Sequence, residues 1–179
     1  MAEFHSMKIA GLDRKLKMFP VSDKLDIAAF ILFGDVEITV AAAEKLLEKA
    51  PEFDYIVTPE AKSIPLAYEM SRQSGKPYIV IRKGVKVYMG DPISVSVRSI
   101  TTQKEQHLYL GEDEVALIKG KKVLIVDDVV STGESLAAVR ELLNKAGCIE
   151  AATCAVLAEG DAKDRDDIIY LEPLPLFFK

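Results

Sequence analysis

One segment in the second half of the chain constrains the fold more than any other. Four consecutive apolar residues, Val123 to Val126, show no polar alternation, which is typical of a strand buried on both faces in a parallel sheet. Two aspartates and a turn rich in small hydroxyl residues follow, and a helical apolar pattern then runs to Gly147, which is placed to end the helix. The segment predicts a buried strand whose carboxyl end turns directly into the amino end of a helix.

The turn between this strand and helix suits a phosphate group. Open α/β sheets bind ligands at this edge, where free backbone N–H groups and the helix dipole attract anions. Ser131, Thr132 and Ser135 add hydroxyl donors, and Gly133 permits positive φ and a close backbone approach. Because the Gly-Lys-Ser/Thr ending of a triphosphate P-loop is missing, the turn predicts a phosphomonoester site.

Asp127 and Asp128 stand just before the turn. Paired carboxylates can accept hydrogen bonds from a vicinal diol and favour positive charge that develops on a nearby sugar carbon. An ordinary strand, turn and helix with solvated acids would not explain these acids, hydroxyls and glycine in one order. The combination describes a 5-phosphoribosyl group that undergoes substitution at its anomeric carbon.

Composition indicates a single globular domain, residues 1–179. Hydrophobic residues make up 49% and charged residues 28% of the 179, which suits a sizeable core. The net charge of −5 argues against nucleic acid as a main partner, because phosphate-backbone binding needs clustered Lys and Arg. No apolar run reaches the roughly 18 residues of a membrane span, so we expect no membrane partner. Met1 to Ser6 is interpreted as a remnant of recombinant expression ahead of a native start at Met7.

Cysteine and histidine usage narrows the chemistry. Cys148 and Cys154 lack the spacing of a metal site and are interpreted as buried thiols, which fits a cytoplasmic protein. With only His5 and His107, the chain does not suit a His-rich metal centre or a Ser-His-Asp hydrolase, and no residue is assigned as a metal ligand.

Alternating strand and helix patterns predict a parallel α/β sheet in the middle of the chain. Strands are expected at 54–58, 78–81 and 151–157, and a long hairpin at 85–110. Asp35 is a candidate N-cap for a helix with Val36, Val40, Ala43 and Leu47 on its inner face, ended by Pro51. A second helix turns Ile64, Ala67 and Met70 inward and ends at Gly75. Residues 168–178 are too rich in proline for a central strand, and residues 7–34 and 165–179 are expected to form a cap.

The segment from Val123 to Ser135 resembles the phosphoribosyl-pyrophosphate (PRPP) signature of the type I phosphoribosyltransferases, most of all the purine (adenine) enzymes. The resemblance implies an α/β fold: a parallel-sheet core with helices on both faces and a small cap, or hood, formed by the two chain ends. Asp127 and Asp128 would be catalytic and hold the ribose hydroxyls. Glu134 stands where the family more often has Gly or Lys. The residues implied to bind the 5-phosphate are Val129, Val130, Ser131, Thr132, Gly133, Glu134 and Ser135.

The resemblance extends to the pyrophosphate and to a catalytic loop. Pro59 to Ser63 resembles the family's pyrophosphate loop, and Ile81-Arg82-Lys83 its Ile-Arg-Lys stretch. Ser96 to Lys104 resembles the catalytic loop, with Thr101 at the position where adenine enzymes carry a Glu. The residues implied to meet the pyrophosphate are Ala61, Lys62, Ser63, Arg82, Lys83 and Lys104.

The purine would contact Val130 and Glu159. Oxopurine enzymes tend to place a Lys near Leu157 to Glu159, where this chain has Ala158-Glu159-Gly160. A carboxylate accepts hydrogen bonds, which suits an amino group better than a carbonyl, so adenine is favoured. The reaction would give AMP and pyrophosphate, with Mg²⁺ bound mainly through PRPP and water, in a homodimer.

Two other functions remain open. Lys62 to Tyr68 also resembles the effector domain of the bacterial purine operon repressor, which suggests a PRPP sensor without turnover. The Ser/Thr-rich stretch from Val95 to Lys104 suggests a xanthine or guanine enzyme instead.

Overall fold

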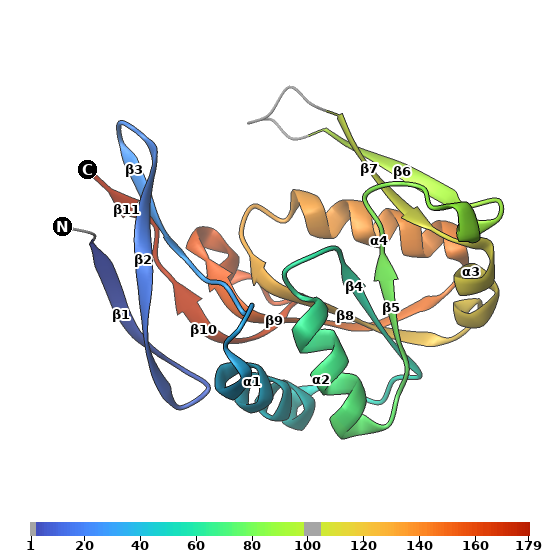
Figure 1. Cartoon of the computed structure of the whole chain (residues 1–179), viewed down its shortest axis with the longest axis horizontal. Helices are drawn as coiled ribbons and strands as arrows, with labels where there is room; N and C mark the ends of the chain where they lie inside the picture. Colours follow the sequence, from blue (N-terminus) through green and yellow to red (C-terminus); the bar gives the residue numbers. More distant parts are fainter. Residues whose placement is uncertain (1–2, 99–104) are drawn as a thin grey trace.

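A computed structural model describes residues 3–98 and 105–179, which fold around a five-stranded parallel sheet (Figure 1). The strand order is β10-β9-β8-β4-β5, and each neighbouring pair is parallel. The strands are β4 (Tyr55–Pro59), β5 (Tyr78–Ile81), β8 (Lys122–Val130), β9 (Ile149–Glu159) and β10 (Ile169–Leu174). The predicted parallel α/β sheet is confirmed.

Helices cover both faces of this sheet, as expected. One face carries α1 (Val36–Lys49) and α2 (Ile64–Ser74), and the other carries α4 (Glu134–Ala146) with the short α3 (Glu112–Ile118) nearby. Short 3-10 helices occupy Val87–Met89 and Gly160–Asp164. Gly75 and Gly147 end α2 and α4 in the left-handed conformation, at φ 70° and 74°.

Two hydrophobic cores lie on opposite faces of the sheet, because successive side chains of a strand point to opposite faces. On β8, Leu124 and Val126 pack under α1 and α2, whereas Val123 and Ile125 pack under α4. Every residue of the apolar run from Val123 to Val126 is therefore buried in one of the two cores. The predicted inner face of α4 is also confirmed, since its members are all buried: Leu136, Val139, Leu142 and Leu143.

The predicted inner face of α1 was wrong in part. Asp35 caps the helix as expected and accepts a hydrogen bond from the Ile38 N–H at 3.1 Å. Val36 and Val40, however, are exposed, at 73% and 38%. The buried stripe comprises Ile38, Thr39, Ala42, Ala43 and Leu46. Apolar residues occur almost all round this helix, so periodicity alone could not select the face that packs on the sheet.

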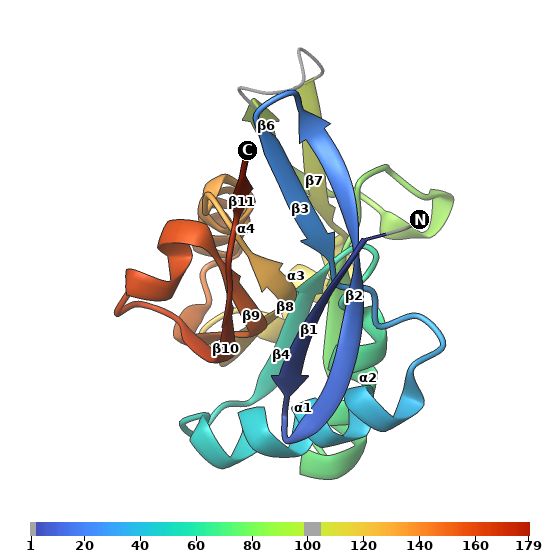
Figure 2. The ribbon, with the colours of Figure 1, turned by 90° about the vertical axis from the view of Figure 1, so that its left-hand side faces the viewer.

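Both chain ends build a small antiparallel cap sheet beside the core (Figure 2). Its order is β1-β2-β3-β11, from β1 (Phe4–Ile9), β2 (Leu12–Ser22), β3 (Leu25–Ala29) and β11 (Phe177–Phe178). The cap confirms the expected hood, but its carboxyl part is shorter than residues 165–179. Residues 169–174 instead form β10 in the main sheet. Pro173 is tolerated there because β10 is an edge strand.

An antiparallel hairpin confirms the expectation for the later part of residues 85–110, whereas Val87–Met89 form a 3-10 helix instead. Its strands are β6 (Ile93–Arg98) and β7 (Glu105–Leu110), which pack on α4. Backbone hydrogen bonds between Arg82 and Tyr109, at 3.0 and 2.8 Å, attach the hairpin to the end of β5. Among the residues that the structure describes, no helix is long and apolar enough to cross a membrane.

Candidate functional site

The carboxyl ends of the central strands gather the polar residues singled out in the sequence. In the register of the sheet, Ile56 of β4 lies opposite Leu124 of β8 and Tyr78 of β5. The turns that follow these parallel strands therefore meet at one edge. In Figure 1 the turn before α2 and the turn before α4 lie between the cap sheet and the hairpin.

The aspartate pair lies on β8 itself, since this strand continues to Val130. Asp128 is buried, Asp127 is half-buried, and the Asp128 N–H donates to Asp127 Oδ1 at 2.9 Å. Burial raises the pKa of the Asp127 carboxyl well above its usual range, and the adjacent Asp128 carboxylate adds to the rise. Two acids are thus held close together in a largely desolvated position.

Lys62 is the cation that faces this pair. Its Nζ lies 2.8 Å from Asp128 Oδ2, and its side chain is half exposed. That carboxylate oxygen has no hydrogen-bond partner of good geometry among the described residues. One ammonium therefore compensates the two acids only in part, which leaves acceptor capacity for donors from a ligand.

The predicted pyrophosphate loop, 59–63, separates into an exposed part and a buried part. Ala61 and Lys62 are exposed, and the peptide bond between Glu60 and Ala61 is cis. Ser63 is 1% exposed, and its hydroxyl donates to the Pro59 carbonyl at 3.1 Å and accepts from Thr58 Oγ1 at 2.8 Å. The Ser63 hydroxyl therefore stabilises the conformation of the loop. Because this side chain is buried, only the backbone of Ser63 can face a ligand.

Glu60 joins this loop to the other predicted pyrophosphate residues. Its Oε2 accepts a hydrogen bond from the Lys83 N–H at 3.0 Å and lies 3.4 Å from Arg82 Nε. Lys62, Arg82 and Lys83 are thereby brought to the same edge of the sheet. The role of Glu60 was missed because its partners lie more than twenty residues away in the sequence.

The turn before α4 has the form expected of an anion-binding turn. Gly133 adopts φ 84°, and α4 begins at Glu134. The Glu134 N–H donates to Thr132 Oγ1 at 3.4 Å, and the Gly133 carbonyl accepts from the Ala137 N–H at 2.8 Å. The first-turn amides of α4 are oriented outward at this point, as helix geometry requires.

The remaining predicted residues are the two purine candidates and two residues of the predicted catalytic loop. Val130 pairs with Ala158 in the sheet, and Glu159 follows at the end of β9, so both purine candidates lie at the same edge. The Val130 side chain is 4% exposed and packs under α4, which leaves its backbone for ligand contact. Thr101 and Lys104 lie outside the described residues.

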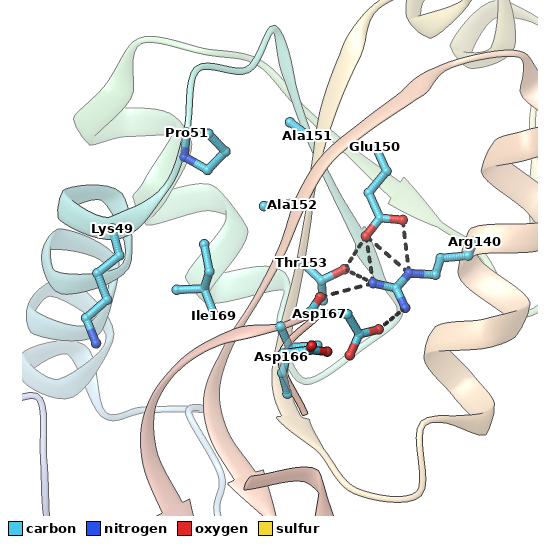
Figure 3. Close-up of a pocket in the computed structure, with 11 residues that line it drawn as sticks. Lys49, Pro51, Arg140, Glu150, Ala151, Ala152, Thr153, Asp166, Asp167 and Ile169 are labelled. Carbon is cyan, nitrogen blue, oxygen red and sulfur yellow. Dashed lines mark hydrogen bonds and ion pairs between the residues drawn. The ribbon is translucent and has the colours of Figure 1, made fainter. Parts of the chain in front are cut away.

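A second charged cluster, which the sequence did not reveal, lies beside a surface cavity of about 660 Å³ (Figure 3). Arg140 of α4 donates to both carboxylate oxygens of Glu150 and, at 2.5 Å, to Asp167 Oδ2. Arg165 donates to both oxygens of Asp167, at 2.8 and 2.7 Å. These two guanidinium groups hold the pKa of Asp167 well below its usual range.

The described part of the chain contains no group of three His, Cys, Asp or Glu residues placed to hold a metal ion. At the sheet edge, Asp127 and Asp128 are two adjacent carboxylates on β8, and two oxygen donors of this kind suit a hard cation that keeps most of its water ligands. A magnesium ion brought by a phosphorylated ligand would fit that chemistry.

Comparisons with known proteins agree with this fold. The family model described as a phosphoribosyl transferase domain matches residues 36–174. A hypoxanthine/guanine phosphoribosyltransferase of Methanococcus voltae is 35% identical over 146 residues, covering 82% of this chain and 72% of its own. One from Methanocella paludicola is 37% identical over 144 residues, covering 80% and 69%.

Solved structures show the same fold at low sequence identity. Adenine phosphoribosyltransferase from Thermoanaerobacter pseudethanolicus superposes with a TM-score of 0.72 at 21% identity, over 88% of this chain and 95% of that one. The Saccharomyces cerevisiae enzyme gives 0.68 at 20% identity, over 94% and 92%. With the family model matching most of the chain, this protein belongs to the type I phosphoribosyltransferase family.

Proposed function

We propose that this protein transfers the 5-phosphoribosyl group of PRPP to a purine base and releases pyrophosphate. The observation that carries the proposal is the order of groups along the sheet edge. The turn at 131–135 suits a phosphate, the Asp127 and Asp128 pair suits a diol, and Lys62 with Arg82 suits a pyrophosphate. PRPP presents these three groups in the same order. The purine class is supported by the names of the sequence relatives.

The geometry suggests how the residues would act. A ribose diol that donates to Asp127 and Asp128 would occupy the acceptor oxygens that Lys62 satisfies only in part. The half-exposed Lys62 ammonium could then turn toward the pyrophosphate, where its charge stabilises the leaving group. The carboxylates would at the same time favour positive charge on the anomeric carbon. Most of the barrier reduction would come from positioning and charge.

Magnesium is proposed as the cofactor, bound mainly through PRPP and water. Bound there, it would neutralise charge on the departing pyrophosphate. Asp127 and Asp128 are the carboxylates that would accept hydrogen bonds from its water ligands.

We propose adenine as the base, on the position of Glu159. Glu159 ends β9 one residue after the partner of Val130, and its carboxylate can accept a hydrogen bond from an exocyclic amino group. Hypoxanthine or guanine is the second candidate, because the sequence relatives carry those names at 35% and 37% identity. The adenine enzymes among the solved structures are about 20% identical and support the fold alone.

A base-competition assay tests this proposal. The protein is given PRPP and Mg²⁺ with adenine, hypoxanthine, guanine or xanthine, and the nucleoside monophosphate is measured by chromatography. Adenine should be preferred by a large factor, since sites built on hydrogen bonds can discriminate by roughly 10⁴-fold. Glu159→Gln, which adds a donor, should shift the ratio toward hypoxanthine, whereas Glu48→Gln on the exposed face of α1 should not. A wild-type preference for an oxopurine would establish the second candidate.

The same assay separates an enzyme from a PRPP sensor. Thr101 cannot act as a carboxylate acid, and general acid catalysis is typically worth 10²–10⁴-fold. Positioning and charge stabilisation do not depend on it, so measurable turnover is expected. Tight PRPP binding in calorimetry without product from any of the four bases would identify a sensor instead.

A homodimer is also proposed. The outer faces of α1 and α2 expose Val36, Val40 and Tyr68, at 73%, 38% and 56%. Large apolar groups that gather on one face often mark an interface. Analytical ultracentrifugation should give twice the mass of the 19.7 kDa chain, and a species of one chain mass would reject the dimer.

A further inference from the structure

The phosphate turn has a neighbour from a distant part of the chain. Arg165 lies just before β10, yet its Nη1 occupies the space where a Cβ on Gly133 would stand. A side chain at position 133 would therefore collide with this guanidinium. The contact places a positive charge directly against the turn that precedes α4.

Arg165 is held in a fixed orientation. Asp167 accepts from its Nε at 2.8 Å and from its Nη2 at 2.7 Å, a two-point pairing that fixes the plane of the guanidinium. Arg140 in turn donates to Asp167, and Glu150 accepts from Arg140. Figure 3 shows these contacts of Arg140 with Asp167 and Glu150. Arg165 is thus positioned before any ligand arrives.

Two features indicate what this guanidinium is placed to bind. Among the described residues, Nη1 has no hydrogen-bond acceptor, although Nε and Nη2 are both paired. Glu134 also adds a negative charge to the first turn of α4, where it would repel a phosphate. A cation against Gly133 offsets this repulsion.

We propose that Arg165 is a further phosphate-binding residue, whose Nη1 donates to an oxygen of the 5-phosphate held by the turn at 131–135. Asp167 and Arg140 are positioning residues for Arg165, because they orient its guanidinium group without touching the ligand. This inference rests on the proposed function, since it assumes that the turn receives the 5-phosphate of PRPP.

Calorimetry with two separate probes tests the proposal. Ribose 5-phosphate reports on the turn, and inorganic pyrophosphate reports on the edge formed by Lys62 and Arg82. Arg165→Met keeps most of the side-chain volume but removes the charge, so it should weaken ribose 5-phosphate binding about tenfold or more and leave pyrophosphate binding unchanged. Arg165→Lys should fall between wild type and Met. Arg72→Met, on the exposed end of α2, is the matched control and should bind both probes as the wild type does.

The outcomes separate the two levels of the argument. If wild type binds ribose 5-phosphate and folded Arg165→Met binds it equally well, the role of Arg165 is rejected and the proposed function stands. If wild type binds no ribose 5-phosphate, the phosphate turn and the inference both fail.

A measurement on the wild-type protein covers the case in which Arg165→Met does not fold. Arg165 is 30% exposed, so phenylglyoxal should modify it, and mass spectrometry can locate the product. Ribose 5-phosphate should protect Arg165, whereas pyrophosphate should not, and Arg72 should react equally in all samples. Absence of protection at saturating ribose 5-phosphate would reject the contact.

Discussion

Two charged clusters in this protein shift the pKa of a carboxyl group in opposite directions. At the sheet edge, Asp127 and Asp128 share one half-exposed lysine, and burial with like charge raises the pKa of Asp127. Beside the surface cavity, Asp167 receives two guanidinium groups, which lower its pKa. The same residue type is thus destabilised as an anion in one place and stabilised in the other.

The difference indicates which of these carboxylates are maintained for direct contact with a ligand. A fold gains stability when its charges are paired, as in the cluster of Arg140, Glu150, Asp167 and Arg165. It loses stability when acids are buried with too few partners. Residues that retain an uncompensated charge are candidates for binding, because a ligand can supply the missing donors. The predictions below test whether this contrast holds.

The largest expected effect is on turnover, from Asp128→Asn. The variant keeps the shape of the side chain but loses the charge that would bind the ribose diol. A hydrogen bond to a charged group is worth about 1.5–3 kcal/mol, so kcat/KM for PRPP should fall by about 10- to 100-fold. Steady-state kinetics with PRPP as the varied substrate measures the loss.

Asp13→Asn is the matched control for that change. Asp13 is 90% exposed, in the cap sheet, and its loss should leave kinetics unchanged. Thermal unfolding must show that Asp128→Asn is folded. Equal kinetics for both variants would remove Asp128 from the site and erase the contrast between the clusters.

The second effect is on stability, from Arg140→Ala. This change leaves Glu150 and Asp167 without their shared cation. Breaking a fully buried pair costs about 3–5 kcal/mol. These groups are 25–40% exposed, so solvent screening reduces the expected loss in the free energy of unfolding to about 1–3 kcal/mol.

The pH dependence of that loss follows from Asp167. Its folded pKa is lowered, so its contribution is present at neutral pH and disappears as pH falls below the usual carboxyl range. In urea unfolding, the difference in the free energy of unfolding between Arg140→Ala and wild type should therefore be larger at pH 7 than at pH 3. Lys45→Ala, which breaks an exposed pair with Glu48 on α1, should change the free energy of unfolding very little at either pH. A loss for Arg140→Ala no larger than that for Lys45→Ala would mean that the cluster is not structural.

How far the sequence predicts these clusters depends on the separation of their members. The aspartate pair, the turn and the inner face of α4 follow one another within a single segment, so local order and spacing define them. Contacts such as Gly133 with Arg165, or Glu60 with Lys83, depend on which strands become neighbours. No local pattern records that pairing.

The fold shows the same dependence on neighbours. The parallel sheet and the hairpin follow from local patterns, but the face of α1 that is buried does not. Val36 and Val40 are as apolar as Ile38 and Leu46, and only docking on the sheet selects between them. Similarly, Pro173 argued correctly against a central strand, yet only the sheet order makes β10 an edge.

The smallest expected effect is a gain in stability from Asp127→Asn in the ligand-free protein. Its sign is opposite to that of the loss expected from Arg140→Ala. The folded pKa of Asp127 is raised to about 8, so its contribution to stability is fully present below the usual carboxyl pKa and is lost as pH rises through that folded pKa. Asparagine removes the penalty at neutral pH. The variant should be more stable than wild type by about 1 kcal/mol at pH 7, which is about 2–4 °C in Tm for a chain of this size.

Differential scanning calorimetry at pH 7 and pH 4 checks the sign, because the gain should shrink at pH 4, where the carboxyl of the unfolded chain also becomes protonated and the two states bind more nearly the same number of protons. Asp13→Asn should show no gain at either pH. A variant that is more stable yet inactive would show that Asp127 is retained for its ligand at the expense of the fold. A loss of stability at pH 7 would mean that Lys62 and the backbone compensate the pair in full, and the contrast with Asp167 would then fail.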